Sequence, residues 1–264
     1  LAVAGTVNDL LTAAARPLVL SASFILEEGL EIDTLRVIAE SMRATAAEAG
    51  VAIVTGDTKV VPKGSADKVF ITTAGVGLVL RPGVSGAAAL PGDEIILTGS
   101  VGDHGTAVML AREKLLEGET IASDAAPLTG LVLNLLEEGC EIHAMRDPTR
   151  GGIAAALNEI ARQSQVSMEI IEARVAVQPA VAAACEALGL DVFQVANEGK
   201  MLIIVAPEDA AKALFIIRRS PYGEAARVIG RVSEAPPGRV QVRTVIGTAR
   251  ILDAPSGDML PRIC

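Results

Sequence analysis

Hydrophobic positions along the chain follow two spacings, and each predicts a different kind of element. Apolar residues at every third or fourth position predict helices over 8–15, 33–49, 106–116, 127–138, 153–163, 179–189 and 208–218. The helix over 33–49 is bracketed by Asp33 and Gly50, residue types that favour the beginning and the end of a helix. These segments predict a helical layer in each half of the chain.

Runs rich in β-branched and apolar residues predict strands between the helices. They cover the opening residues 1–4 and then 17–26, 51–61, 67–79, 94–98, 141–146, 168–175, 192–206, 226–232, 240–243 and 248–252. We expect a turn at Gly5–Thr6, a break in the strand at Gly56, and a strand pair around a corner at 197–200. Strands and helices mixed in this order indicate the α+β class.

The segment "RPGVSGAAALPGD" is rich in Pro and Gly and marks a domain boundary. We therefore predict an N-terminal domain over residues 1–88 and a second α+β domain over 89–252. The remaining residues, 253–264, are rich in Pro, Gly and Ser and lack hydrophobic periodicity. They are expected to form a flexible tail.

Composition excludes several classes of function. The formal net charge of the 264 residues is −9, and the chain has one Tyr, four Phe and no Trp. Nucleic-acid binding needs basic surfaces and aromatic stacking, so we expect none. No apolar run has the length of a membrane span, so no membrane partner is expected either. The three cysteines include no CxxC pair and no secretory signal is visible, which favours a cytoplasmic location.

Four short segments combine small residues with acidic or amide side chains: "GTVNDL" (5–10), "TGDTKV" (55–60), "RDPTRGG" (146–152) and "ANEGK" (196–200). Each alone is typical of an ordinary turn or cap. None is a Walker A loop, and no GxGxxG follows a strand. Together they predict a site for ATP and Mg²⁺ without a P-loop.

The carboxylates Asp9, Asp57 and Asp147 are hard oxygen ligands suited to Mg²⁺. A glycine pair at a helix start, with an arginine beside it, offers N–H groups to phosphate. Lys59 and Glu198 are placed for electrostatic stabilisation and proton transfer. The nucleotide contacts that we expect are Asn8, Asp9, Asp57, Thr58, Asp147, Arg150, Gly151, Gly152 and Asn197. His104 in "GDHG" is a lesser candidate, more typical of a loop histidine.

The chain ends in Pro261-Arg262-Ile263-Cys264. A prenylation signal places its cysteine four residues from the end, so this is not a lipid anchor. A frayed terminus, where any residue is tolerated, is the simplest alternative. Cys140, at a strand start, and Cys185, in an alanine-rich helix, are expected to be buried small hydrophobes.

The set GT-x-ND, FILEEGL, GDTKV, DPTRGG, NEGK and terminal PRIC resembles the HypE family, the carbamoyl dehydratases of [NiFe]-hydrogenase maturation. The resemblance covers the whole chain. The family belongs to the ATP-binding superfamily that includes aminoimidazole ribonucleotide synthetase and selenophosphate synthetase. It implies a two-domain fold of the aminoimidazole ribonucleotide synthetase type and a homodimer with nucleotide near the interface of the N-terminal domains.

The resemblance also implies a reaction. Cys264 receives a carbamoyl group from a partner carbamoyltransferase, ATP drives its dehydration to a thiocyanate, and the cyano group passes to iron on a scaffold complex. Asp9 and Asp147, joined by Asp57, serve Mg²⁺–ATP, while Lys59 and Glu198 act on the thiocarboxamide. A tail extending 11 residues beyond Asp253 reaches about 35–40 Å, enough to visit both an internal site and a partner.

Two features of the resemblance leave alternatives open. Family members carry a glycine-rich segment and an acidic Thr-Asp-Ser motif before the point where Leu1 stands, so we expect a truncated chain that folds but hydrolyses ATP poorly. Another synthetase of the superfamily is an alternative function, although such reactions need no tethered thiol. A carrier module that only presents Cys264 is a second alternative.

Overall fold

The computed structural model describes residues 1–113 and 121–256. Cys264 and the rest of 257–264 lie outside the described residues, as do residues 114–120. The α-helices are α1 (Ala2–Thr12), α2 (Ile32–Ala49), α3 (Asp103–Glu113), α4 (Thr129–Glu137), α5 (Gly152–Gln163), α6 (Pro179–Leu188) and α7 (Ala210–Arg218). Short 3₁₀ helices follow β6 and α6: η1 (Glu172–Arg174) and η2 (Val192–Gln194).

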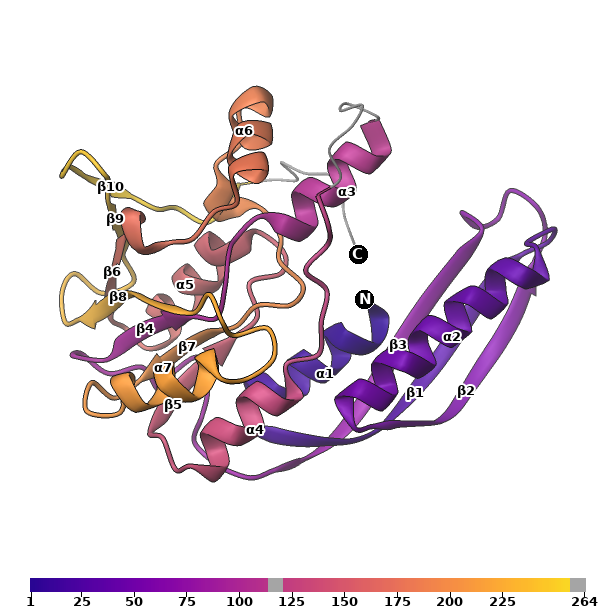
Figure 1. Cartoon of the computed structure of the whole chain (residues 1–264), viewed down its shortest axis with the longest axis horizontal. Coiled ribbons are helices and arrows are strands. Elements are labelled where there is room, and N and C mark those ends of the chain that lie inside the picture. Colours follow the sequence, from indigo (N-terminus) through magenta and orange to yellow (C-terminus); the bar gives the residue numbers. More distant parts are fainter. Residues whose placement is uncertain (114–120, 257–264) are drawn as a thin grey trace.

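The strands form two sheets (Figure 1). The smaller has the order β2-β1-β3 and consists of β1 (Ala15–Glu27), β2 (Ala52–Val61) and β3 (Val69–Val79). The larger has the order β10-β9-β6-β8-β4-β7-β5 and consists of β4 (Glu94–Leu97), β5 (Ile142–Arg146), β6 (Ser167–Ile171), β7 (Leu202–Val205), β8 (Arg227–Ser233), β9 (Val240–Arg243) and β10 (Ala249–Ile251). This mixed architecture confirms the predicted fold class.

One face of the small sheet is covered by helices. Strands β1 and β2 are parallel and joined through α2, and β3 pairs antiparallel with β1. Helix α1 lies against β3, where the Thr6 and Thr73 hydroxyls are 2.6 Å apart. A Cβ at Gly75 would lie 2.8 Å from the side chain of Leu10 on α1. The lack of a side chain at this glycine lets the helix approach the strand.

The other face of the small sheet is open. Alternate residues of β3, including Phe70 (50% exposed) and Val76 (61%), point away from α1. Ile25 on β1 pairs with Phe70 and is also exposed. Since alternate strand residues share a face, these side chains form a continuous apolar surface.

The central strands of the large sheet, β4 and β7, are buried between two helical layers (Figure 1). In β4, Ile96 joins one core with residues of α4 and α7, whereas Ile95 and Leu97 join a second core with residues of α5. All four residues of β7 are buried. Such central strands read as continuous apolar runs, because both faces are covered.

Helix α1 connects the two halves of the chain. Its Val7 and Leu11 belong to the same core as residues of α4, β5 and β7. The linker that precedes β4 is also anchored, since the Ser85 N–H donates to the His143 carbonyl at 3.1 Å. The predicted boundary at residues 88 and 89 falls within this linker and stays a prediction.

The predicted strand and turn at the N-terminus are wrong. Residues from Ala2 onward form α1, and "GTVNDL" is part of that helix rather than a loop. The buried residues Val3, Val7 and Leu11 are spaced four apart, as on one face of a helix. The apolar run over residues 1–4, on which the strand was predicted, is too short to show this spacing.

Two further predictions about strands are wrong. Strand β2 runs through Gly56, where a Cβ would lie 2.1 Å from the Ala22 carbonyl oxygen, so this glycine permits close strand approach rather than a break. "TGDTKV" is therefore strand, not loop. The predicted strand pair over 192–206 is the 3₁₀ turn η2, a loop and β7. The Asp191 carboxylate starts that turn by accepting the Phe193 N–H at 3.0 Å.

Among the described residues, no helix is both long and apolar enough to cross a membrane.

Candidate functional site

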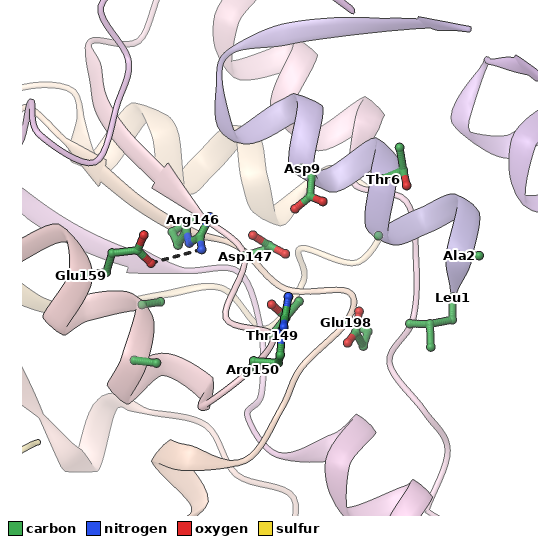
Figure 2. Close-up of a pocket in the computed structure, with 13 residues that line it drawn as sticks. Leu1, Ala2, Thr6, Asp9, Arg146, Asp147, Thr149, Arg150, Glu159 and Glu198 are labelled. Carbon is green, nitrogen blue, oxygen red and sulfur yellow. Dashed lines mark ion pairs between the residues drawn. The ribbon is translucent and has the colours of Figure 1, made fainter. Parts of the chain in front are cut away.

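A pocket of about 390 Å³ lies where α1 meets two loops of the large domain (Figure 2). Helix α1 contributes Asp9, the loop between β5 and α5 contributes Asp147 and Arg150, and the loop before β7 contributes Glu198. Figure 2 shows the three carboxylates around one space. Asp9 is more than a hundred residues from the other two in the sequence, and the packing of α1 on the large domain brings the three together.

Buried amides hold these elements in place. The Asn197 side chain donates to the carbonyls of Pro148 (3.1 Å) and Val195 (3.0 Å), and its oxygen accepts the Gly102 N–H (2.7 Å). It therefore ties the Glu198 loop to the Asp147 loop. Buried amides with every hydrogen bond made are rigid connections.

Asn8 connects α1 to the same region. Its side-chain N–H groups donate to the carbonyls of Ala126 (3.0 Å) and Glu198 (3.2 Å), while its oxygen accepts the Leu128 N–H (2.9 Å). The amide is thus engaged within the chain, next to Asp9. This arrangement makes Asn8 a positioning residue, and a direct contact from Asn8 or Asn197 to nucleotide stays a prediction.

The pKa values of Asp147 and Asp9 are raised, which favours their neutral forms. Burial raises the pKa of Asp147 to about 6, and the nearby charge of Asp9 adds to the rise. Burial also raises the pKa of Asp9, although Arg146 and Arg150 oppose the change. A buried carboxylate whose pKa is raised by a second carboxylate nearby is a favourable place for a cation.

The pKa of Glu198 is raised as well. Burial raises its pKa to about 7, with further contributions from the charges of Asp147 and Asp124. A carboxyl group with a pKa near neutrality can accept and return a proton under physiological conditions. Glu198 therefore has the properties of a general base.

Two arginine side chains line one wall of the pocket. Arg146 pairs with Glu159 of α5 at 3.1 Å, and Arg150 lines the same wall. Sequence reasoning did not select Arg146, Glu159 or Thr6 as pocket residues. The signal for Arg146 was its place as the last residue of β5, next to Asp147. Glu159 lies seven residues into α5 and is recognised only once the helix is docked.

The structure shows a packing role for the glycine pair, and the expected contact of its N–H groups with phosphate stays a prediction. Gly152 has φ +59°, and a Cβ there would lie 2.5 Å from the Phe193 carbonyl oxygen. Its N–H donates to the Thr149 carbonyl at 3.1 Å and is thus already bonded. Gly151, with φ +74°, would bring a Cβ within 3.2 Å of Pro255. The last described residues thus pass beside the pocket loop.

The remaining predicted residues lie elsewhere. Asp57, Thr58 and Lys59 are on β2, exposed and not part of the pocket lining. Asp57 pairs in register with Ser23, and Lys59 with Ile25. A single chain therefore does not bring Asp57 to Asp9 and Asp147, or Lys59 to Glu198. His104 is buried and hydrogen-bonded to Ser123 at 2.8 Å.

Over residues 1–113 and 121–256, no three His, Cys, Asp or Glu side chains form a ready metal-binding group. Asp9 and Asp147 are the available pair, and Mg²⁺ is commonly held by one or two carboxylates together with substrate phosphates. Cys140 and Cys185 are buried free thiols, as expected.

Two family models match the chain. Residues 1–79 match the N-terminal domain of AIR synthase related proteins, and residues 91–243 match the C-terminal domain. The carbamoyl dehydratase HypE of Rhizobium leguminosarum bv. viciae is 53% identical, over 100% of this chain and 76% of that protein.

Solved structures are similar over the same extent. A hydrogenase maturation protein HypE in complex with ATP is 47% identical, with a TM-score of 0.96, covering 100% of this chain and 80% of that one. A HypE–HypF complex contains a chain that is 47% identical, with a TM-score of 0.92, covering 96% of this chain and 83% of that one.

Proposed function

Since the chain belongs to the HypE family of carbamoyl dehydratases, we propose that it uses ATP to remove water from a carbamoyl group on the Cys264 sulfur, leaving a thiocyanate that supplies cyanide for the iron centre of a [NiFe]-hydrogenase. The observation that carries this proposal is Glu198. Its carboxyl group, with a pKa of about 7, shares a pocket with Asp9 and Asp147.

The reaction requires a base and a better leaving group. Conversion of S–C(=O)NH₂ to S–C≡N breaks the C–O bond and removes two N–H protons. Transfer of the γ-phosphoryl group of ATP to the carbonyl oxygen lets that oxygen leave as phosphate, so the products are thiocyanate, ADP and phosphate. Glu198 takes one N–H proton as the oxygen is phosphorylated and passes it to solvent, then takes the second as the C–O bond breaks and passes it to solvent or phosphate.

The charged residues of the pocket suit the phosphoryl-transfer step of this reaction. Arg150 and Arg146 supply positive charge for the phosphates. Asp9 and Asp147 fit Mg²⁺, because the charge of Asp9 raises the pKa of Asp147 and a divalent cation would relieve this repulsion. The metal would supply charge neutralisation at the phosphates, and these two carboxylates would hold it.

The thiol reaches this pocket through the tail. Pro255 lies beside Gly151 on the pocket loop, and the sequence continues for eight residues beyond the described part. Eight residues span up to about 26–29 Å when extended. That length is sufficient for Cys264 to enter the pocket or to be presented to another protein.

We also propose that a second copy of the chain completes the site. Asp57 and Lys59 project from β2 in register with Ser23 and Ile25, on the same open face as Phe70. Exposed apolar area of this kind marks an association surface. A homodimer that covers it would allow one copy's Lys59 and Asp57 to serve the partner copy's pocket.

Other partners follow from the reaction. A HypE has been solved in complex with HypF, and we propose a carbamoyltransferase of this kind as the donor to Cys264. An iron-carrying scaffold complex would accept the cyano group. A free thiol must persist between these steps, so we place the protein in the reducing cytoplasm.

The direct test is the mass of the C-terminal peptide. The protein is incubated with its carbamoyl donor system, then with ATP, and conversion is followed as a single turnover. The dehydratase gains one carbamoyl group and then loses one water only when ATP is present. Carbamoylation without loss of water would indicate a carrier module, and no modification would indicate another synthetase. Cys264→Ala should abolish both mass changes.

A further inference from the structure

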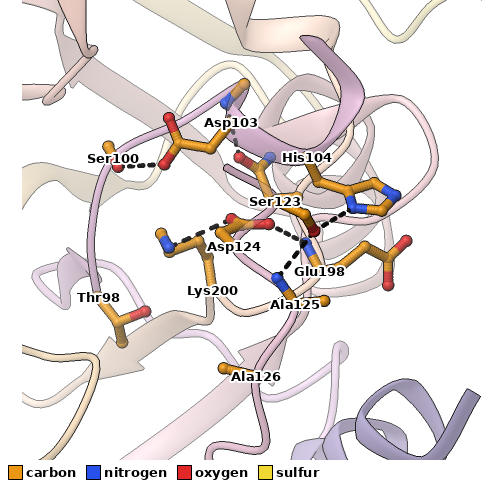
Figure 3. Close-up of polar contacts among 12 residues, drawn as sticks. Thr98, Ser100, Asp103, His104, Ser123, Asp124, Ala125, Ala126, Glu198 and Lys200 are labelled. Atoms are coloured by element: carbon orange, nitrogen blue, oxygen red, sulfur yellow. Dashed lines mark hydrogen bonds and ion pairs between the residues drawn. The ribbon is translucent and has the colours of Figure 1, made fainter. Parts of the chain in front are cut away.

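We propose that Asp124 is the positioning residue of Glu198. Asp124 lies in the segment 121–128, which has no helix or strand. Its side chain is only 4% exposed, and its Oδ1 accepts the backbone N–H of Glu198 at 3.0 Å (Figure 3). The carboxylate thereby fixes the main chain of the residue whose side chain faces the pocket. This inference rests on the proposed role of Glu198 as the base.

The backbone of the same loop also packs on Asp124. A Cβ at Gly199 would lie 1.8 Å from the Asp124 carbonyl oxygen. No other residue fits this position without moving one of the two segments. The loop is therefore held by a side-chain hydrogen bond at residue 198 and by close main-chain packing at residue 199.

Lys200 supplies the counterion for Asp124. Its ammonium lies 3.2 Å from the Asp124 Oδ2, and its side chain is 11% exposed. Figure 3 shows Asp124 between Lys200 and Glu198. A Cβ at Gly99 would lie 2.7 Å from the Lys200 Cε, so that glycine provides room for the lysine. Lys200 thus lies outside the lining of the catalytic pocket and is ion-paired with Asp124.

This arrangement has a consequence for catalysis. Charge-assisted hydrogen bonds to a carboxylate are about twice as strong as neutral ones. A base must also stay within hydrogen-bond reach of the proton that it removes, and a displacement of about 1 Å costs on the order of 100-fold in rate. Asp124 therefore acts through Glu198 without touching the substrate.

The decisive variants are Asp124→Ala and Asp124→Asn. The alanine removes the acceptor, so we expect the Glu198 amide to lose its protection from hydrogen exchange. The single-turnover dehydration rate should fall about 10–100-fold, while the apparent KM for ATP changes less than about threefold. The asparagine keeps an acceptor oxygen in place and should preserve both the protection and most of the rate.

Asp103→Ala is the matched control. Asp103 is as deeply buried and also acts electrostatically with Lys200, but its carboxylate accepts from Ser100 at 2.5 Å rather than from Glu198. Its loss should leave the Glu198 amide protected. A purely structural role for Asp124 would instead lower stability in both alanine variants and leave the rate per folded molecule unchanged.

The exchange of the Glu198 amide in the unmodified protein tests the proposal even where Asp124→Ala fails to fold. An amide that exchanges as fast as an unstructured one would overturn it, as would a folded alanine variant with wild-type rate. The exchange measurement is independent of the proposed reaction. If the wild type never loses water while the variant alone loses protection, the dehydratase proposal fails and the positioning proposal stands.

Discussion

At the scale of single residues, Glu198 is a carboxyl group whose surroundings oppose its charge. Burial is the main cause of its raised pKa, and Asp147 and Asp124 add to it. Each of these features destabilises the ionised form in the folded protein. A general base whose pKa lies near 7 therefore lowers the stability of the folded protein, as is common at active sites.

Replacing Glu198 by Gln should therefore stabilise the protein above neutral pH. The folded pKa of about 7 exceeds the unfolded value of 4.5, so the folded state binds more protons between these values and wild-type stability falls as pH rises through that window. We expect the Glu198→Gln variant to gain up to about 3 kcal/mol at pH 8 and less at pH 5.5.

Urea unfolding at the two pH values measures this gain. Glu208→Gln, at an exposed position, is the matched control and should change stability equally at both. A Glu198→Gln gain that does not increase with pH would contradict the electrostatic account of this residue.

At the scale of elements, the pocket depends on how the start of α5 meets the residues around η2. Gly152 allows this contact, since its Cβ position is 2.5 Å from the Phe193 carbonyl and 2.6 Å from the Val195 carbonyl. Asn197 then ties the following loop to Pro148. The position of Glu198 relative to Asp147 is therefore set by main-chain packing as well as by side chains.

Gly152→Ala should consequently destabilise the fold by about 2–4 kcal/mol, because the added methyl clashes with backbone and φ is positive. Gly130→Ala is the control, since nothing lies within 4 Å of a Cβ at that helical position. It should be neutral or stabilise by up to about 1 kcal/mol. Thermal unfolding of both variants checks the pair, and equal effects would contradict the packing argument.

The linker before β4 is anchored by a pH-dependent contact. His143 Nδ1 lies 2.8 Å from the Asp93 Oδ2, which also accepts the Leu90 N–H. Burial opposes charge on His143, but its bond to Asp93 prevails and its pKa is raised. The contact stabilises fully below the unfolded pKa of about 6.5 and is lost as pH rises through the raised folded value.

His143→Gln should therefore lower stability by about 1–2 kcal/mol at pH 6 and by less at pH 9. Melting temperatures of the wild type and the variant at both pH values provide the measurement. A variant that is equally destabilised at pH 6 and pH 9 would show that the charge of His143 does not contribute.

At the scale of the whole molecule, the open face of the small sheet carries both apolar side chains and the charged pair Asp57 and Lys59. If two copies complete each other's pockets, neither Lys59→Ala nor Glu198→Gln homodimers should dehydrate the carbamoyl group. After the two variants are mixed and exchange subunits, half of the dimers contain one copy of each variant. Each mixed dimer has one intact site out of two, so the mixture should recover about one quarter of wild-type activity.

Phe70→Lys in both variants is the control for this experiment. It places charge on the exposed apolar face, so it should lower the fraction of dimer measured by sedimentation and abolish the recovery of activity in the mixture. Ile246→Lys, at a position that is 81% exposed in the β9–β10 turn, should do neither. Full activity of the Lys59→Ala protein would rule out the role proposed for that lysine.

The sequence predicted the long elements well because their periodicity is strong. The helix over 33–49 and the strand over 67–79 correspond to α2 and β3. It predicted the second half of α1 within a helix over 8–15 but missed the first half, where Val3 and Val7 begin one buried face in a segment too short and alanine-rich to show it. Local pattern carries little information about such a helix.

The candidate site was predicted in part for a related reason. Asp9, Asp147 and Glu198 stood out as acidic residues beside glycines or amides, and the fold brings them together. The only signal for Arg146 was its place beside Asp147, Glu159 is recognised as a pocket residue only from the packing of α5, and Asp124 lacks any motif. Contacts between distant segments depend on packing, which residue type and spacing do not encode locally.

The most direct test of the whole account is the fate of carbamoylated Cys264 in the Glu198→Gln protein. With ATP present, the wild-type peptide should lose one water. The variant should accept the carbamoyl group but lose water at least about 100-fold more slowly, because the proton acceptor is gone. Dehydration at the wild-type rate in that variant would contradict the assignment of this pocket.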